Sequence, residues 1–425
     1  MLSNKNLLEK IKNKTANIGV IGLGYVGLPL AVLLAKNNFK VTGFVRSESK
    51  RDSLNKGVSY LLDAVLEGDL KTVIKSNNFI CRLTSDKELE NMDAYIICVP
   101  TPVNEHKIPD ISDLKQVAKR LSQISLEGKL VVNESTVAPF TTRDVLGKIG
   151  ENYFLVCSPE RIDPGNNSKT TENIAKVIGG IDGQSLEAGV ALYKQILKEE
   201  LAQVKTLEAA EMAKMLENTY RAVNIALINE FARLAEKINI DILDVIKAAK
   251  TKWSFHPHFP GIGVGGHCIP VDPYYILELA KDKGVAMKVV KEGLEENEQM
   301  PLFVAQKVDH SYKKGMKVLV YGLTYKKNVA DMRESPVTAF CNILRERNIS
   351  FSVYDPLLKD KEIEKLGFNA GSLEKADIFI VGTDHKQLSE DFKKAVGDNT
   401  VVIDGRNFFT EKVGKAVYGV GRSLL

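Results

Sequence analysis

The sequence lacks most of the features that mark a secreted, membrane-bound or nucleic-acid-binding protein. Its five cysteines are widely spaced and form no C-x-x-C pair, which argues against a disulfide framework or a cysteine-rich zinc site. Lysine and arginine (58) nearly balance aspartate and glutamate (54), and no basic block points to nucleic acid or an anionic membrane. No apolar run approaches the length of a membrane span, and the lysine-rich start has no signal-peptide core. We therefore expect a cytoplasmic protein with no membrane or nucleic-acid partner.

The length and the pattern of short apolar runs indicate an α/β protein with more than one domain. A chain of 425 residues exceeds what a single hydrophobic core usually holds. Short β-branched runs alternate with helical segments near the start of the chain and again after residue 315. This alternation predicts two Rossmann-like, doubly wound domains with parallel sheets.

A glycine-rich turn near the N-terminus has the surroundings of a dinucleotide site. The turn Gly22-Leu23-Gly24-Tyr25-Val26-Gly27 follows the apolar run 18–21 and precedes the helical segment 28–36. Glycines in a strand–turn–helix context expose backbone N–H groups to a pyrophosphate and allow the helix to pack closely on the strand. We expect this turn to bind the cofactor.

The residue that usually selects the cofactor is absent. The second strand ends at Val45, where such domains normally present an acidic residue to the ribose hydroxyls, and Arg46 and Ser47 follow. Loss of the acid weakens NAD binding without abolishing it, whereas an arginine beside a serine could hold a 2′-phosphate. NAD is the expected cofactor, NADP stays an alternative, and Arg46 could also be a solvated surface charge.

Polar residues follow the later strands of the first half of the chain. Thr101 comes after the apolar run 94–99, Thr136 comes after 129–133, and Glu160 and Arg161 come after 154–157. Open parallel sheets bind ligands at the carboxyl ends of their strands. These residues are therefore candidates for the site.

The loop 261–275 looks most like a catalytic segment. It carries four glycines between Gly261 and Gly266, then Cys268, and Asp272 four residues later. Such backbone freedom suits close approach of a ligand. The alternative is that Cys268 is an inert buried thiol, as we expect for Cys81, Cys98, Cys157 and Cys341.

The segment 208–238 predicts one long connecting helix, because it contains neither glycine nor proline. Leu216, Val223, Leu227 and Phe231 form an apolar stripe, which packs either in a core or against a second subunit. Lys214 and Asn218 share one face at the i, i+4 spacing. A lysine there usually faces solvent, but the apolar neighbours favour its burial.

Taken together, the motifs resemble those of the nucleotide-sugar 6-dehydrogenases, the UDP-glucose/GDP-mannose dehydrogenase family. The resemblance covers nearly the whole chain and rests on five segments: 22–27, 134–137, 158–161, 265–272 and 322–336. It implies an N-terminal dinucleotide-binding domain (1–204), a central helical domain with the catalytic loop and dimer interface (205–300), and a C-terminal UDP-sugar domain (301–425). The long helix would join the two Rossmann-like domains and build a homodimer or a higher homo-oligomer.

The resemblance also implies a reaction, namely oxidation of the sugar C6 alcohol to a carboxylate with two nicotinamide cofactors. Cys268 would attack the intermediate aldehyde and form a thiohemiacetal and then a thioester. Lys214 and Asn218 would stabilise the developing alkoxide, and Asp272 would hold Lys214 and a water. Glu160 would activate the hydrolytic water, which Thr136 helps to position.

The family motifs imply further binding residues. Lys326 matches a lysine that contacts the nucleotide sugar, Arg406 an arginine that reaches the diphosphate, and Arg333 an arginine near the cofactor pyrophosphate. Gly265 and Arg161 lie in these motifs and are expected to bind the substrate, and Thr101 is expected to bind the cofactor. For the three cations, the alternative is an ordinary surface charge.

Details of the loop favour an N-acetylated sugar. Glucose-specific members often carry serine and lysine where this chain has His267 and Val271. We expect UDP-N-acetylglucosamine, narrowly ahead of UDP-N-acetylmannosamine and ahead of UDP-glucose, in a pathway to a surface polysaccharide. His256 and His258 lie beside prolines without carboxylate or thiol partners, so we expect no metal site. A two-electron β-hydroxyacid dehydrogenase and a catalytically silent nucleotide-binding protein are the alternatives.

Overall fold

The fold comes from a computed structural model, which describes residues 5–61, 63–162 and 170–422. The chain forms two compact units. Unit 1 comprises residues 1–217 and 274–282, and unit 2 comprises residues 218–273 and 283–425. The long helix α8 (Leu207–Lys237) begins in unit 1 and ends in unit 2. It matches the helix that the sequence predicts over residues 208–238.

Unit 1 is built on an eight-stranded sheet with the order β3-β2-β1-β4-β5-β6-β7-β8. Every neighbouring pair is parallel except β6 and β7, which run antiparallel. The strands are β1 (Asn17–Ile21), β2 (Lys40–Val45), β3 (Phe79–Leu83), β4 (Ala94–Ile97), β5 (Leu130–Asn133), β6 (Phe154–Cys157), β7 (Lys176–Gly180) and β8 (Leu201–Val204). The helices are α1 (Lys5–Lys12), α2 (Gly27–Lys36), α3 (Glu48–Asn55), α4 (Ala64–Lys75), α5 (Ser112–Leu121), α6 (Thr141–Leu146) and α7 (Gly183–Tyr193), with a 3-10 turn at Lys87–Asn91.

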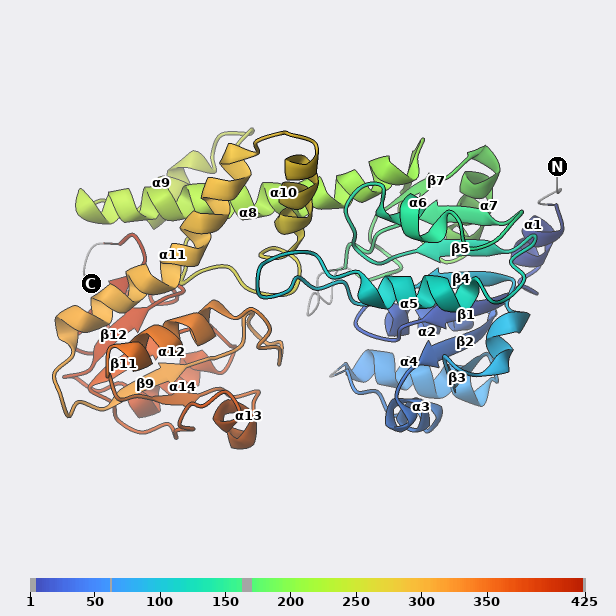
Figure 1. The fold of residues 1–425 in the computed structure, drawn as a ribbon. Helices are drawn as coiled ribbons and strands as arrows, with labels where there is room; N and C mark the ends of the chain where they lie inside the picture. The colour runs from blue at the N-terminus through green and yellow to red at the C-terminus, as the bar shows by residue number, and fades with distance from the viewer. Residues whose placement is uncertain (1–4, 62, 163–169, 423–425) are drawn as a thin grey trace. The chain divides into compact units, whose positions relative to one another are not determined.

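Helices cover both faces of this sheet, as its apolar strands require. One face packs against α1, α2, α4 and α7, and the other packs against α5, α6 and the start of α8 (Figure 1). Alternate strand residues divide between the two cores, so Val20 lies with the first set of helices and Ile21 with the second. The carboxyl ends of β1, β4, β5 and β6 therefore share one edge.

Unit 2 contains a five-stranded parallel sheet with the order β10-β9-β11-β12-β13. Its strands are β9 (Val318–Tyr321), β10 (Ser352–Tyr354), β11 (Ile378–Val381), β12 (Val401–Asp404) and β13 (Ala416–Gly419). Its helices are α9 (Ile242–Ala249), α11 (Lys288–Ser311), α12 (Pro336–Glu346), α13 (Asp360–Glu364) and α14 (Leu388–Ala395), and α10 (Asp272–Asp282) starts in this unit. Helices α11 and α12 cover one face together with α8 and α9, and α14 covers the other.

The expected class, two Rossmann-like doubly wound domains with a long central helix, is confirmed. The four cysteines assigned to packing, Cys81, Cys98, Cys157 and Cys341, are buried. No helix within the described residues is long and apolar enough to cross a membrane. Nor do the His, Cys, Asp and Glu side chains of the described residues gather into a group that could hold a metal ion.

The apolar stripe on α8 does not pack in the core of this chain. Leu216, Leu227 and Phe231 are 66%, 47% and 53% exposed, and Val223 is half-buried. Met212, Tyr220 and Leu234 extend the same exposed stripe along the helix, and the exposed Ile238 follows directly after its end. Of the two expectations for this stripe, burial within the chain is therefore wrong.

Candidate functional site

The glycine turn of unit 1 has the shape that a dinucleotide pyrophosphate needs. Gly22 has φ +90°, and an added Cβ would lie 2.5 Å from the Cys98 carbonyl oxygen. At Gly27, the first residue of α2, an added Cβ would lie 1.9 Å from the Gly22 oxygen. Gly24, by contrast, has no atom within 4 Å of such a Cβ. Two glycines are thus needed for packing, while the third leaves the backbone open to a ligand at a helix N-terminus.

Arg46 lies at the end of β2 and already has a partner. Its Nη1 and Nη2 donate to Asp113 Oδ1 and Oδ2 at 2.7 and 3.0 Å, while Val45 is buried. Asp113 belongs to the first turn of α5, 67 residues away in sequence. A carboxylate that accepts two hydrogen bonds from the guanidinium competes with a 2′-phosphate for the same donors.

Thr101 and Thr136 meet at the carboxyl edge of the first sheet. Thr101 Oγ1 donates to the Thr136 carbonyl at 2.7 Å, and the Tyr275 hydroxyl donates to the Thr101 carbonyl at 2.6 Å. Ser135 Oγ accepts a bond from the Val99 N–H at 3.0 Å. The structure therefore brings together two residues that the sequence placed after separate strands.

Glu160 sits in a buried ionic cluster at the same edge. Its Oε1 accepts from the N–H groups of Arg161 and Ile162 at 2.6 and 2.9 Å, and its Oε2 lies 3.2 Å from Lys176 Nζ. Lys176 and Glu134 are fully buried and 2.7 Å apart. The neighbouring Arg161 pairs with Glu217 at 2.8 Å. Sequence reasoning missed Lys176, because a lysine at the start of an unpredicted strand gave no signal.

Helix α8 presents Lys214 and Asn218 on one face, and Lys214 is 8% exposed, so of the two alternatives for this lysine burial is the correct one. Asn218 Nδ2 donates to Asp272 Oδ2 at 2.5 Å, and Asp272 is buried as the first residue of α10. The family resemblance connected Asp272 with Lys214; it gave no signal for the contact with Asn218.

The loop that carries Cys268 is held against the segment 322–336 of unit 2. A Cβ at Gly265 would lie 2.6 Å from the Glu334 carbonyl oxygen, and a Cβ at Gly266 would lie 2.6 Å from the Tyr325 ring. The Gly266 N–H donates to the Arg333 carbonyl at 3.3 Å. The Cys268 carbonyl accepts from the Asp272 N–H at 2.8 Å, and the side chain of Cys268 is partly exposed.

The same loop also contacts the strand end that carries Arg406. The Ile262 N–H donates to the Gly405 carbonyl at 2.9 Å, and a Cβ at Gly261 would lie 3.5 Å from Arg406 Nη1. Arg406 Nε lies 3.3 Å from Asp384 Oδ1. The structure thus places the cysteine loop, the 322–336 segment and Arg406 along one edge of the second sheet. Arg333 pairs with Asp331 at 2.6 Å, and Lys326 is half-buried.

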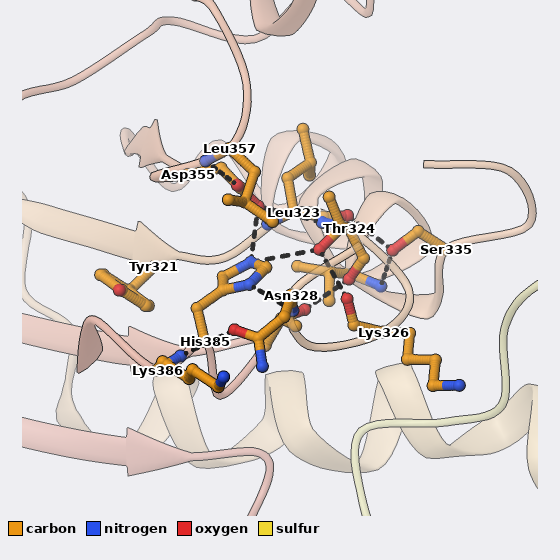
Figure 2. A network of polar contacts seen from close by, with 12 residues as sticks. Tyr321, Leu323, Thr324, Lys326, Asn328, Ser335, Asp355, Leu357, His385 and Lys386 are labelled. Carbon is orange, nitrogen blue, oxygen red and sulfur yellow. Dashed lines mark hydrogen bonds and ion pairs between the residues drawn. The ribbon is translucent and has the colours of Figure 1, made fainter. Parts of the chain in front are cut away.

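A buried histidine ties together the loops that follow three strands of this sheet (Figure 2). His385 Nδ1 accepts from the Asn328 N–H at 3.0 Å, so Nε2 carries the proton and faces Asp355 Oδ2 at 3.2 Å. Asp355 Oδ2 also accepts from the Leu323 N–H at 2.7 Å. Burial works to raise the pKa of Asp355, but the bonds from His385, Leu357 and Leu323 outweigh it and lower that pKa. The network fixes the segment that carries Lys326.

Comparison with protein families gives three consecutive matches along the chain. The NAD-binding domain of the UDP-glucose/GDP-mannose dehydrogenase family matches residues 16–197. The central domain of this family matches residues 208–299, and its UDP-binding domain matches residues 319–411.

Individual relatives extend this similarity over the whole chain. A UDP-N-acetyl-D-mannosamine dehydrogenase of Methanococcus vannielii is 34% identical over 95% of this chain and 96% of its own. A UDP-N-acetyl-D-glucosamine 6-dehydrogenase of Pseudomonas aeruginosa is 36% identical over 81% and 83%. The solved structure of a UDP-D-ManNAc dehydrogenase from Pyrococcus horikoshii superposes with a TM-score of 0.85 at 31% identity, covering 96% of this chain and 99% of that one.

Proposed function

Because the chain belongs to the UDP-glucose/GDP-mannose dehydrogenase family, we propose that it oxidises the C6 alcohol of a UDP-N-acetylhexosamine to the carboxylate. The observation that carries the proposal is the seating of the Cys268 loop on the 322–336 segment and Gly405, at one edge of the second sheet. We favour the N-acetylglucosamine epimer narrowly over the N-acetylmannosamine epimer, for which several relatives are named.

Cys268 is the proposed nucleophile. Hydride leaves readily from a carbon that bears an oxygen anion, which an aldehyde does not have. Attack by the thiolate on the C6 aldehyde forms a thiohemiacetal, and its oxidation gives a thioester. Water then hydrolyses the thioester, which releases the carboxylic acid and restores the Cys268 thiolate. The partial exposure of Cys268 is consistent with this role, because a nucleophile has to be reached by the substrate.

Preorganised donors would stabilise the charge that forms on oxygen. Lys214 and Asn218 lie on one face of α8, and donors at that spacing are suited to an alkoxide in a dry site. Asp272, held by Asn218, would serve the proton transfers. Glu160 would take a proton from the hydrolytic water, which Thr136 would help to position.

The binding residues divide between two ligands. The turn 22–27, Thr101 and Thr136 of unit 1 would hold NAD, which supplies a hydride acceptor for each of the two oxidations. Lys326, Arg406 and Gly265 of unit 2 would hold the nucleotide sugar together with Arg161, and Arg333 would approach the cofactor pyrophosphate. We propose NAD rather than NADP, because Arg46 is paired with Asp113.

A homodimer or higher homo-oligomer in the cytoplasm is the proposed state. The exposed stripe of α8, from Met212 to Leu234, is a continuous apolar surface of the kind that a second copy buries. Sedimentation of wild type and of Phe231→Glu tests this. We expect a stable dimer for wild type and a shift toward monomer for the variant.

The reaction is tested by counting reduced cofactor. Purified protein is mixed with limiting UDP-N-acetylglucosamine, UDP-N-acetylmannosamine or UDP-glucose and excess NAD or NADP. We expect two NADH per N-acetylhexosamine consumed, with one epimer preferred. A yield of one NADH per sugar would contradict the thioester route, and no turnover with tight UDP-sugar binding would favour a silent binding protein.

Cys268→Ser separates this function from a two-electron β-hydroxyacid dehydrogenase. Such an enzyme has no need of a thiol, so its rate would be nearly unchanged. The proposed reaction requires acid formation to collapse. Cys341→Ser, at a buried packing position, serves as the control.

A further inference from the structure

Lys176 stands opposite Glu160 because one pair of strands reverses direction. In the antiparallel pair of β6 and β7, Val156 faces Gly180 and Cys157 faces Gly179. Continued for three more positions, this register sets Glu160 against Lys176. A parallel β7 would have started at the opposite edge of the sheet. The reversal therefore delivers a lysine to the edge where the strands carry Thr101, Thr136 and Glu160.

The environment of Lys176 is fully enclosed and charged. Its Nζ lies 2.7 Å from Glu134 Oε2 and 3.2 Å from Glu160 Oε2, and its side chain has no exposed surface. The Tyr193 hydroxyl donates to the other oxygen of Glu134. Burial alone would lower the pKa of Lys176, but the charges of Glu134 and Glu160 outweigh it and raise that pKa. The lysine is therefore a fixed cation.

We propose that Lys176 is a positioning residue for thioester hydrolysis: it holds one oxygen of Glu160, so that the carboxylate is correctly aimed, while the Arg161 and Ile162 N–H groups hold the other oxygen. The proposal rests on the proposed function, in which Glu160 activates water. The two oxygens of the Glu160 carboxylate are thus held by different groups: one by backbone N–H groups of the chain that follows it, and the other by the Lys176 ammonium from the neighbouring antiparallel strand. Lys176 Nζ also donates to Glu134 Oε2 at 2.7 Å, and a glutamine at position 134 would keep an oxygen that can accept this bond.

The step that this arrangement serves needs a carboxylate and no oxidant. The water oxygen bonds to the acyl carbon while one water proton passes to Glu160. The carbon–sulfur bond breaks and leaves its electron pair on the Cys268 sulfur. The products are the free acid, a thiolate and a protonated Glu160. A Glu160 that was protonated beforehand, or turned away, could not accept this proton.

The hydride transfers come before this step, so loss of Lys176 has a distinctive kinetic signature. The test variant is Lys176→Met/Glu134→Gln, which removes the cation and also the negative charge of Glu134 that the cation neutralises. The control is Glu134→Gln alone, which keeps the ion pair between Lys176 and Glu160. Rapid mixing with NAD and the UDP-N-acetylhexosamine follows NADH, and intact-protein mass spectrometry follows adducts on Cys268.

For the double variant, we expect a normal burst of two NADH per site and then turnover reduced roughly tenfold or more, since general base catalysis contributes about 10²–10⁴-fold. The acyl adduct should accumulate on the double variant and stay absent from Glu134→Gln. Equal loss of burst and turnover without an adduct, or unchanged turnover, would overturn the proposal. If the double variant does not fold, Lys176→Arg is tested for the same signature with a smaller decrease.

The failure of the proposed function would look different. A wild-type enzyme that yields one NADH per sugar, or none, contradicts the function itself. A wild-type enzyme that yields two, combined with variants that lose both phases equally, contradicts only the role of Lys176.

Discussion

Asn218 and Asp272 are joined by a 2.5 Å hydrogen bond, which ties the middle of α8 to the first residue of α10. Asp272→Asn keeps an oxygen that can accept this bond but removes the carboxylate. We expect kcat to fall roughly 100-fold or more, because proton transfers lose their base, with little change in Tm. Sugar-dependent NADH formation measures this. Asp282→Asn, at the exposed end of the same helix, should keep the wild-type rate, and full activity of Asp272→Asn would remove this carboxylate from the chemistry.

The pairing of Arg46 with Asp113 predicts how cofactor choice would change. Asp113→Ala frees the guanidinium, so we expect kcat/KM with NADP to rise about tenfold, the gain of one charge-assisted contact of about 1.4 kcal/mol. The exposed pair contributes little to stability, so Tm should not move. The double variant Arg46→Ala/Asp113→Ala should lose the gain. If NADP use stays unchanged in Asp113→Ala, Arg46 is only a surface charge.

Two glycines with nearly the same φ angle allow backbone strain to be separated from steric contact. Gly266 has φ +93° and a Cβ there would meet the Tyr325 ring, whereas Gly315 has φ +95° and open space. Both alanine variants bear roughly 1–3 kcal/mol of backbone strain. We expect only Gly266→Ala to lose most activity, because the Cys268 loop must shift away from Tyr325. Steady-state rates and Tm values for both variants test this, and equal activity would show that the loop tolerates the displacement.

Glu211 predicts a pH dependence of stability. Its carboxylate accepts from the Phe140 and Thr142 N–H groups at 2.8 Å, and burial raises its pKa to about 7 from 4.5. The folded state therefore binds this proton more tightly, so the stabilisation is complete below pH 4.5 and is lost as the pH rises through 7. Between pH 5 and 8, wild type should lose about 3 kcal/mol more than Glu211→Gln. Urea midpoints at both pH values measure the difference, and parallel pH profiles would contradict it.

Local patterns sufficed for much of this fold, and the parts that they missed depend on distant contacts. The turn 22–27 places its glycines directly after a β-branched run, and most strands are short apolar runs, so local chemistry alone predicts them. The run 176–180 begins with lysine and ends in two glycines, which disguises a fully buried strand. The pairs Arg46–Asp113 and Asn218–Asp272 join residues more than 50 positions apart.

The α8 stripe shows a different limit. Its periodicity revealed an amphipathic helix, but periodicity alone carries no information about what covers the apolar face. Lys176 shows a third limit. A charged residue is normally predicted to be exposed, and its burial can be predicted only when the residues that neutralise its charge are known.

The position of His385 has a consequence for motion in unit 2. One imidazole contacts the segments after β9 and β10 from its own place after β11 (Figure 2). If any one of these three segments moves away, a polar group in the other two loses its hydrogen-bond partner, and leaving such a group unpaired in a buried place costs free energy. Opening at this edge is therefore a concerted event, and amide hydrogens there should exchange with solvent as a single cooperative group.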